Sequence, residues 1–457
     1  MPLHYTPMVI SDLGSHGWHA EKYSTTRSHL RIYNNVGLTA HYKRSTETSV
    51  KSALCHALSS LISKHPILSA IPLAVETPDP YFVRLPVYQL EEVITFVTLN
   101  SAPSSSHWKA ALDKTLEEQH NYPFLFNPDR PLPFWRISIL ESEQIPESFT
   151  LVFMFHHALM DTKSALSFHD ELETHMNQVN VDLQSGERVS SIRPPSDALV
   201  PPLEDLYTLP LSKDFLRSQE NPKEPSPDSW TGSPQFTPVK TRFSSLWLSN
   251  AHTRTLAALS KKEGSSVTAV LQTLIATCLF SVLPPEYKTL QADCAVSLRS
   301  FLPQPVTATT MGCYVGSVPT VYQRAPFNWN EARRTKAVLN HAMALKGGDM
   351  GVGYLRFVEN QHHWMLQKLG RKRMAAFELS NVGVGHPSPR GAGFEVGGML
   401  FSQSSSACSA AIKISAVTGR DGRLALGFTW QEGVVDDEMI EWVQQALESQ
   451  VEELVSE

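Results

Sequence analysis

A proline-rich stretch near the middle of the chain places the strongest constraint on its fold. Ten prolines lie between Pro194 and Pro238, where the average composition of the chain would give about three. Proline fixes its own backbone angle and removes a hydrogen-bond donor, so regular helices and sheets are disfavoured there. The stretch therefore predicts a linker that divides the 457-residue chain into halves of roughly 190 and 220 residues, each near the usual size of a domain.

Both halves mix helical and extended patterns. Segments rich in β-branched and aromatic residues predict strands at 30–43, 133–140, 148–157, 239–249, 289–299, 313–322, 377–384, 407–417 and 423–433. Apolar residues at three- and four-residue spacing predict a helix that ends before Pro66, another at 164–176 and a closing helix at 436–454. The mixture predicts an α/β fold.

Composition excludes several partners and locations. The formal net charge is −6 without a long basic run, so we predict no nucleic-acid partner, which would need a clustered basic surface. The five cysteines form no CxxC pair, which favours a reduced, cytoplasmic protein. The first residues lack a signal-peptide pattern, and no apolar run approaches the roughly 18 residues of a membrane span. We therefore predict a cytoplasmic chain without a transmembrane segment.

One segment carries candidate catalytic chemistry. At 150–172 an apolar strand leads into His156 and His157, Asp161 follows, and a helix begins. Side chains at such a strand end emerge into clefts. A neutral imidazole there can take the proton of an alcohol whose oxygen attacks an activated carbonyl. The segment predicts His157 as a general base, with Asp161 orienting the histidine loop either directly or through an arginine.

The same residues have a structural alternative. His157 is then a buried histidine of a sheet, and Asp161 only caps the following helix. The chain has no HExxH, GxxxxGK[ST] or GxSxG motif, which argues against a zinc protease, a P-loop nucleotide-binding protein and an α/β-hydrolase. We predict no metal site.

The ordered motifs of the chain resemble those of a known superfamily. HHALMD (156–161) resembles the HHxxxD signature of the chloramphenicol-acetyltransferase-like superfamily, within which the fungal alcohol acetyltransferase family is nearest. The resemblance continues, in the expected order, at 13–36, 131–140, 295–303, 311–319, 379–383, 401–410 and 429–443. Two departures are Thr162, where condensation domains usually carry glycine, and the absence of the DFGWG motif of plant BAHD acyltransferases.

The resemblance implies an architecture. It implies two chloramphenicol-acetyltransferase-like lobes, each a mixed sheet flanked by helices, with an active-site tunnel at their interface. It places the N-terminal lobe at 1–185, a crossover linker at 186–245 and the C-terminal lobe at 246–457. Within the last of these, 396–408 is expected to reach across and close the tunnel.

The resemblance also implies residue roles. His157 is the base, and His156 packs beneath the site. Asp161 faces away from the substrate and pairs with Arg299. Ser380 and Asn381, just before a glycine turn, polarise the thioester carbonyl or line the tunnel; the alternative for both is ordinary turn chemistry.

The implied function is transfer of an acyl group, an acetyl group above all, from acyl-CoA to a hydroxyl of a small molecule. Acetyl-CoA is then a co-substrate, no cofactor stays bound, no covalent enzyme intermediate forms, and the chain is expected to be a monomer. Turnover is expected to rise with pH through a pKa near the ordinary value for histidine, about 6.5 before any shift caused by its surroundings. The alternatives are an N-acyltransferase, a condensation-like enzyme fed by a carrier-protein thioester, and a non-catalytic scaffold of the same fold.

Overall fold

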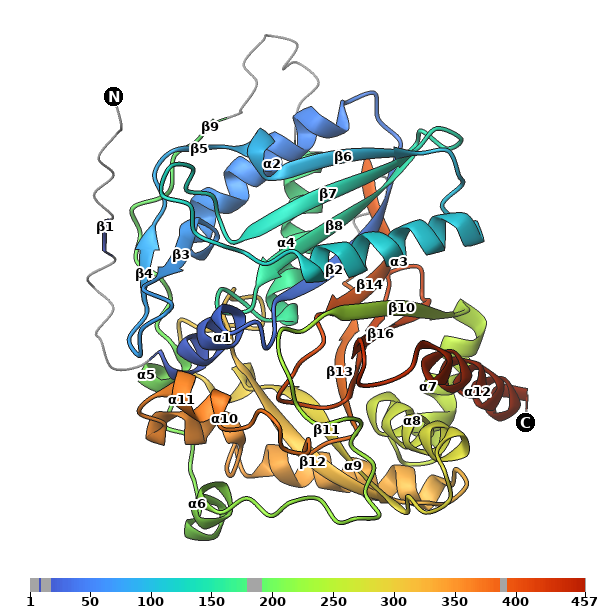
Figure 1. Cartoon of the computed structure of the whole chain (residues 1–457). Helices are drawn as coiled ribbons and strands as arrows, with labels where there is room; N and C mark the ends of the chain where they lie inside the picture. The colour runs from blue at the N-terminus through green and yellow to red at the C-terminus, as the bar shows by residue number, and fades with distance from the viewer. Residues whose placement is uncertain (1–7, 10–17, 179–190, 387–392, 457) are drawn as a thin grey trace.

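Two large sheets, one above the other in Figure 1, organise the chain. The computed structural model describes residues 8–9, 18–178, 191–386 and 393–456. Residues 13–17 of the N-terminal resemblance and the predicted boundary at 185–186 lie outside these ranges. Separate hydrophobic clusters fill the two lobes, so each sheet has its own core.

The first sheet carries the histidine motif. Its strand order is β14 (Phe394–Gln403), β2 (Asn35–Arg44), β8 (Ser148–His156), β7 (Trp135–Ser142) and β6 (Ile94–Leu99). The central strand β8 is buried from Phe149 onwards, as its continuous apolar run predicts. The helices α2 (Val50–Lys64) and α4 (Thr162–Asn177) pack together, and α4 contacts the sheet. This packing fixes the strand-to-helix turn that follows β8.

The second sheet has six strands. Its order is β10 (Thr241–Leu248), β16 (Leu424–Gln431), β15 (Ile412–Thr418), β13 (Phe377–Val384), β11 (Thr289–Ser297) and β12 (Val315–Gln323). The helices packed with this lobe are α7 (Asn250–Lys262), α8 (Val267–Val282), α9 (Trp329–Ala344) and α12 (Asp437–Ser456). Helix α8 contacts the other three, and its largely apolar sequence is accordingly buried over most of its length.

Further helices and short strands complete the fold. Two of these helices are longer, α1 (His19–His29) and α3 (Ser106–Asn121), and two are short, α10 (Gly351–Tyr354) and α11 (Gln361–Leu366). The remaining strands are β1 (Met8–Val9), β3 (Ala70–Leu73), β4 (Tyr81–Arg84), β5 (Tyr88–Gln89) and β9 (Ser191–Ile192). Among the described residues, no single helix is both long and apolar enough to span a bilayer; α7 and α8 meet that test only as a pair bent by 103°.

The C-terminal half sends one strand into the first sheet. Strand β14 pairs antiparallel with β2 along its length, apart from one irregularity between Val396 and Met399. The chain then runs on beside β2, where Ser404 and Ala407 donate backbone hydrogen bonds to Asn35 and Ile32. The segment expected to reach across, 396–408, thus begins earlier, at the start of β14.

The end of the linker was predicted too late. Strand β10 starts at Thr241, inside the predicted linker 186–245, and pairs with β16 over all eight residues. Alternate side chains of its sequence face the interior, a pattern that outweighs the nearby prolines. The described part of the linker, from residue 191 to 240, holds only β9 and the short helices α5 (Leu203–Leu206) and α6 (Lys213–Glu220).

Buried histidines predict an acid-sensitive fold. Burial lowers the pKa of His41, His157 and His169 to about 4, and that of His120 and His156 to about 3. Unfolding returns each pKa to about 6.5, so the unfolded chain binds more protons between these values. The contribution of these histidines to the free energy of unfolding is therefore fully present above about pH 6.5. It is lost as the pH falls toward 4, by up to about 1.4 kcal/mol per histidine and pH unit.

Thermal denaturation between pH 7.5 and 5 measures this effect, and we expect the melting temperature to stay nearly constant down to about pH 6.5 and to fall from there to pH 5. The variant His169→Gln removes one such group, so its melting temperature should depend less on pH, whatever its stability at pH 7.5. A melting temperature that stays constant from pH 7.5 to 5 would contradict the prediction.

Candidate active site

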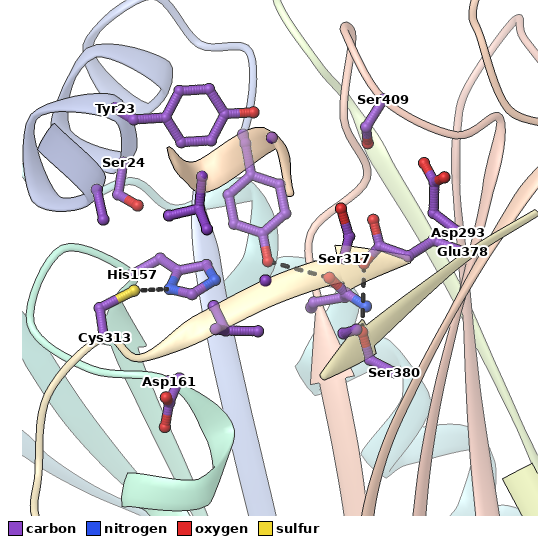
Figure 2. A pocket seen from close by; sticks show the side chains of 18 of the residues that line it. Tyr23, Ser24, His157, Asp161, Asp293, Cys313, Ser317, Glu378, Ser380 and Ser409 are labelled. Atoms are coloured by element: carbon purple, nitrogen blue, oxygen red, sulfur yellow. Dashed lines mark hydrogen bonds between the residues drawn. The ribbon is translucent and has the colours of Figure 1, made fainter. Parts of the chain in front are cut away.

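A cavity of about 430 Å³ is lined by residues of both sheets and of α1. Figure 2 shows His157 on one side of it and Asp293, Glu378 and Ser380 on the other. All four of these side chains are polar, and the wall around them includes apolar residues of β2, β11 and β12. A pocket of this kind, with a few converging polar groups, suits a small organic ligand.

His157 is held with one ring nitrogen facing this cavity. It follows the end of β8, and its Nδ1 lies 3.2 Å from the carbonyl oxygen of Met160. Because a carbonyl only accepts hydrogen bonds, Nδ1 carries the proton and Nε2 keeps its lone pair. The ring points into the cavity in Figure 2, and its side chain retains partial exposure there.

The surroundings keep this imidazole neutral. Burial, and then the positive charge of Arg27, lower the pKa of His157 to about 4. The Sγ atom of Cys313 lies 3.7 Å from Nδ1, and the ring of Tyr33 lies 5.8 Å away between centroids. Burial and the neighbouring cation thus shift the pKa of His157 below the value of about 6.5 that the sequence predicts before any effect of the surroundings.

His156 faces away from this chemistry. It is the last residue of β8, is buried, and packs against the ring of Phe134 at 5.6 Å between centroids. Its Nδ1 accepts the backbone N–H of Ala158 at 3.0 Å. The side chain thus supports the turn that carries His157, and the cavity lining does not include it.

Asp161 and Arg299 form a buried ion pair between the lobes. The guanidinium binds both carboxylate oxygens, with Nη1–Oδ2 at 2.6 Å and Nη2–Oδ1 at 2.9 Å. The two side chains are 7% and 5% exposed, so solvent hardly screens the pair. Arg299 also donates to the carbonyl oxygens of Thr310 and Gly312, which ties the histidine loop to the segment before β12.

The Asp161 carboxylate accepts further hydrogen bonds in addition to those from Arg299. Besides Arg299, it accepts the backbone N–H groups of Ser164 and Tyr314, both at 3.0 Å. The first of these contacts is the N-cap of α4, so Asp161 caps the helix and also forms the ion pair, whereas the structural alternative had it only as a cap. Burial raises the pKa of Asp161, but the charge and hydrogen bonds of Arg299 outweigh it and leave the pKa below its ordinary value.

Ser380 and Asn381 both line the cavity, and Figure 2 shows Ser380 on the wall opposite His157. The Ser380 hydroxyl donates to Glu378 at 3.3 Å. The Asn381 amide donates to Thr268 at 3.0 Å and accepts the backbone N–H of Gly383 at 2.9 Å. Gly383 has a positive φ of 89°, as a glycine turn requires. The contacts of Asn381 therefore favour the turn explanation for this residue.

A polar network beside the base was not predicted from the sequence. The Tyr33 hydroxyl donates to Gln403 at 3.2 Å, and Lys413 donates to Gln403 at 3.4 Å and to Glu378 at 2.7 Å. Arg27 stacks on the rings of Tyr23 and Tyr33, at 4.1 and 4.6 Å from their centroids. These residues come from α1, β13, β14, β15 and the turn before β2, so no sequence motif unites them.

The family follows from a comparison of the whole chain with known proteins. A family model described as alcohol acetyltransferase matches residues 104–448. The chain belongs to the alcohol acetyltransferase family. It is 33% identical to the probable alcohol acetyltransferase crmB of Aspergillus fumigatus, over 93% of this chain and 97% of that protein. It is 22% identical to the probable alcohol acetyltransferase FCK4 of Fusarium pseudograminearum, over 92% and 90%. The predicted enzyme class, an O-acetyltransferase, is confirmed with the family.

Solved structures confirm the fold. The TRI3 trichothecene 15-O-acetyltransferase of Fusarium sporotrichioides superposes with a TM-score of 0.71 at 12% identity, over 96% of this chain and 94% of that one. The first condensation domain of the CDA synthetase gives 0.62 at 13% identity, over 97% and 96%. At such identities the likeness concerns the fold alone. This member of the alcohol acetyltransferase family thus has the two-lobed α/β fold predicted from its motifs.

Proposed function

We propose that the chain transfers an acetyl group from acetyl-CoA to a hydroxyl of a small-molecule acceptor, with His157 as the general base. The orientation of His157 is the observation that carries the proposal. Its Nδ1 donates a hydrogen bond to the carbonyl oxygen of Met160, and its Nε2 can accept a proton from a ligand in the cavity. Membership of the alcohol acetyltransferase family supports acyl transfer as the type of reaction. The donor, the base and the order of events are the proposed part. The cytoplasmic location and the monomeric state stay predictions.

The proposed step needs no covalent enzyme intermediate. The acceptor oxygen attacks the thioester carbonyl carbon while its proton moves to Nε2 of His157. A tetrahedral oxyanion forms, and its collapse breaks the carbon–sulfur bond. The departing thiolate takes the proton from Nε2, which yields the acetyl ester, CoA and a neutral histidine. A thioester is already activated, so a correctly placed base meets the main chemical requirement.

The ion pair of Asp161 and Arg299 supports this step indirectly. Its hydrogen bonds join the loop after β8 to the segment before β12, and they hold the carboxylate in contacts that do not include His157. Among the described residues, no group of three or more metal-binding side chains is present. We assign proton transfer to His157 and substrate binding to the residues that line the cavity.

A screen of acyl-CoA donors against small alcohols and amines tests the proposal, with release of free CoA as the readout. We expect acetyl-CoA with an alcohol to give the fastest release, dependent on His157. Exclusive turnover of amines, or turnover only with a carrier-protein thioester, would replace the proposal with one of the two enzymatic alternatives.

The pH dependence of turnover gives a separate test. With a pKa of about 4, His157 is neutral at pH 6 to 8, so proton acceptance should not limit turnover there. Protonation of His157 should lower turnover only as the pH drops toward about 4, where imidazolium replaces imidazole. Because the fold itself is predicted to lose stability below about pH 6.5, initial rates are measured from pH 8 down to the pH at which circular dichroism first shows unfolding, and turnover should show no fall with a midpoint near 6.5 in that range.

Arg27→Met offers a matched variant for the pH profile. Removing this positive charge should move the acidic fall in turnover to higher pH, because the charge of Arg27 lowers the pKa of His157. A midpoint near 6.5 in the folded wild-type protein, unchanged in Arg27→Met, would contradict the assigned environment.

A further inference from the structure

A row of charged side chains crosses the second sheet on the cavity side. Asp293 of β11 is the register neighbour of Glu378 of β13, which is the register neighbour of Lys413 of β15. All three residues line the cavity that holds His157. Figure 2 shows Asp293 and Glu378 together on the wall across from His157.

The charges of this row do not balance. The Nζ of Lys413 lies 2.7 Å from Glu378, and these side chains are 4% and 18% exposed, so they neutralise each other. Asp293 has no cation within ion-pair distance in the part of the chain that the structure describes; it has a side-chain hydrogen bond with Gln291. Like charges on directly opposed strand positions destabilise a sheet. The row therefore holds one uncompensated carboxylate at Asp293.

The protonation of Asp293 fits this environment. Burial, and then the negative charge of Glu378, raise the pKa of Asp293 to about 6. The carboxyl group is thus mainly ionised at pH 7 to 8. A cation placed beside it would offset both the like-charge repulsion and the cost of burial.

A hydroxyl group without a hydrogen-bond partner lies near Asp293. The hydroxyl oxygen of Ser409 is buried and has no hydrogen-bond partner in the described structure. Ser409 also lines the cavity, and in Figure 2 it faces the same part of it as Asp293. Buried hydroxyl groups are normally hydrogen-bonded, so this one is free to accept a hydrogen bond from a ligand.

We propose that Asp293 and Ser409 bind the ammonium group of an acceptor that carries a basic amine in addition to the hydroxyl that is acetylated. The inference rests on the proposed function of the cavity. An amine held as ammonium at Asp293 has no free lone pair, so it cannot attack the thioester. The acceptor hydroxyl is left to face His157 across the cavity. This arrangement assigns the enzyme to O-acetylation of amino alcohols, in preference to their N-acetylation.

Ligand binding tests this inference without requiring turnover. Isothermal titration at pH 7.5 compares matched pairs of amino alcohols and their deaminated analogues, beginning with phenylalaninol and 3-phenylpropan-1-ol. We expect at least one pair in which the amino alcohol binds about tenfold more tightly or better, as a buried charge-assisted contact allows. The variant Asp293→Asn should remove that preference, and Ser409→Ala should reduce it.

The controls separate this inference from other effects. Asp129→Asn removes an exposed surface carboxylate and should keep the preference, since the net charge changes equally. The melting temperature of Asp293→Asn should not fall, because the substitution relieves the repulsion from Glu378. Equal affinity within every pair, or a preference that survives Asp293→Asn, would overturn the inference.

Turnover distinguishes the inference from the proposed function. If the ammonium preference depends on Asp293 but no acetyl-CoA is consumed with any bound alcohol, the proposed function fails and the binding site stands. If the deaminated alcohols are acetylated as efficiently as the amino alcohols, with equal affinities, the proposed function stands and the ammonium site is rejected.

Discussion

Replacement of His157 by alanine is expected to lower turnover by about 100- to 10,000-fold, the usual contribution of a general base. The variant loses the nitrogen that takes the acceptor proton, while the ion pair of Asp161 and Arg299 and the backbone of the loop remain. The fold and the affinity for CoA should therefore stay close to those of the wild type. Initial rates of CoA release, thermal denaturation and titration with CoA measure the three quantities.

His156→Ala is the matched control. This neighbouring imidazole is buried and accepts a hydrogen bond from Ala158, so its loss should mainly destabilise the turn. We expect a smaller loss of turnover that follows the loss of stability. The base assignment would be wrong if His157→Ala kept more than a tenth of wild-type turnover, or if the two variants exchanged their effects.

Breaking the ion pair of Asp161 and Arg299 is expected to have the largest effect on stability. Asp161→Asn and Arg299→Met each leave a buried polar partner uncompensated, which typically costs about 3–5 kcal/mol. Asp161→Asn also weakens the N-cap of α4 and the contact with the Tyr314 N–H. Both variants should therefore melt at lower temperature and turn over more slowly. Thermal denaturation gives the melting temperature, chemical denaturation gives the free energy of unfolding, and initial rates give the turnover.

The double variant separates a structural carboxylate from a catalytic one. Residues in direct contact couple by about 0.5–3 kcal/mol, so the double variant should be less destabilised than the sum of the single variants. An Asp161 that oriented His157 directly would behave differently: Asp161→Asn would reduce turnover at nearly unchanged stability, and Arg299→Met would act independently. Strict additivity in both stability and rate would rule out a functional pair.

The part of the site that lies on one continuous segment was predictable from the sequence. The buried strand β8, the turn with His157 and the helix α4 each carry a local signal: an apolar run, a change of period and the capping residue Asp161. Arg299 was found through its place in a resembling strand. The structure brings it to Asp161, a contact that joins residues 138 positions apart and that periodicity alone could not reveal.

The remaining part depends on tertiary packing. Helix α1 supplies Tyr23, Ser24 and Arg27 to the cavity, yet the strand predicted at 30–43 was the nearest element recognised. The sequence of α1 is polar, and several of its polar residues are buried. Helix α1 therefore has no apolar stripe from which a helix can be predicted. Lys413 lies within the strand predicted at 407–417, where no local pattern shows that it is buried against Glu378.

The crossing of β14 into the first sheet has a consequence for synthesis of the chain. Strand β2 pairs with residues at least 350 positions further along. A ribosome adds about 5–20 residues per second, so roughly 20–70 s pass between emergence of the two strands. During that interval one edge of β2 has no β14 to pair with, and open edges recruit other chains. We therefore expect chaperones to bind the nascent N-terminal lobe. In the N-terminal lobe expressed alone, this edge of β2 would stay unpaired.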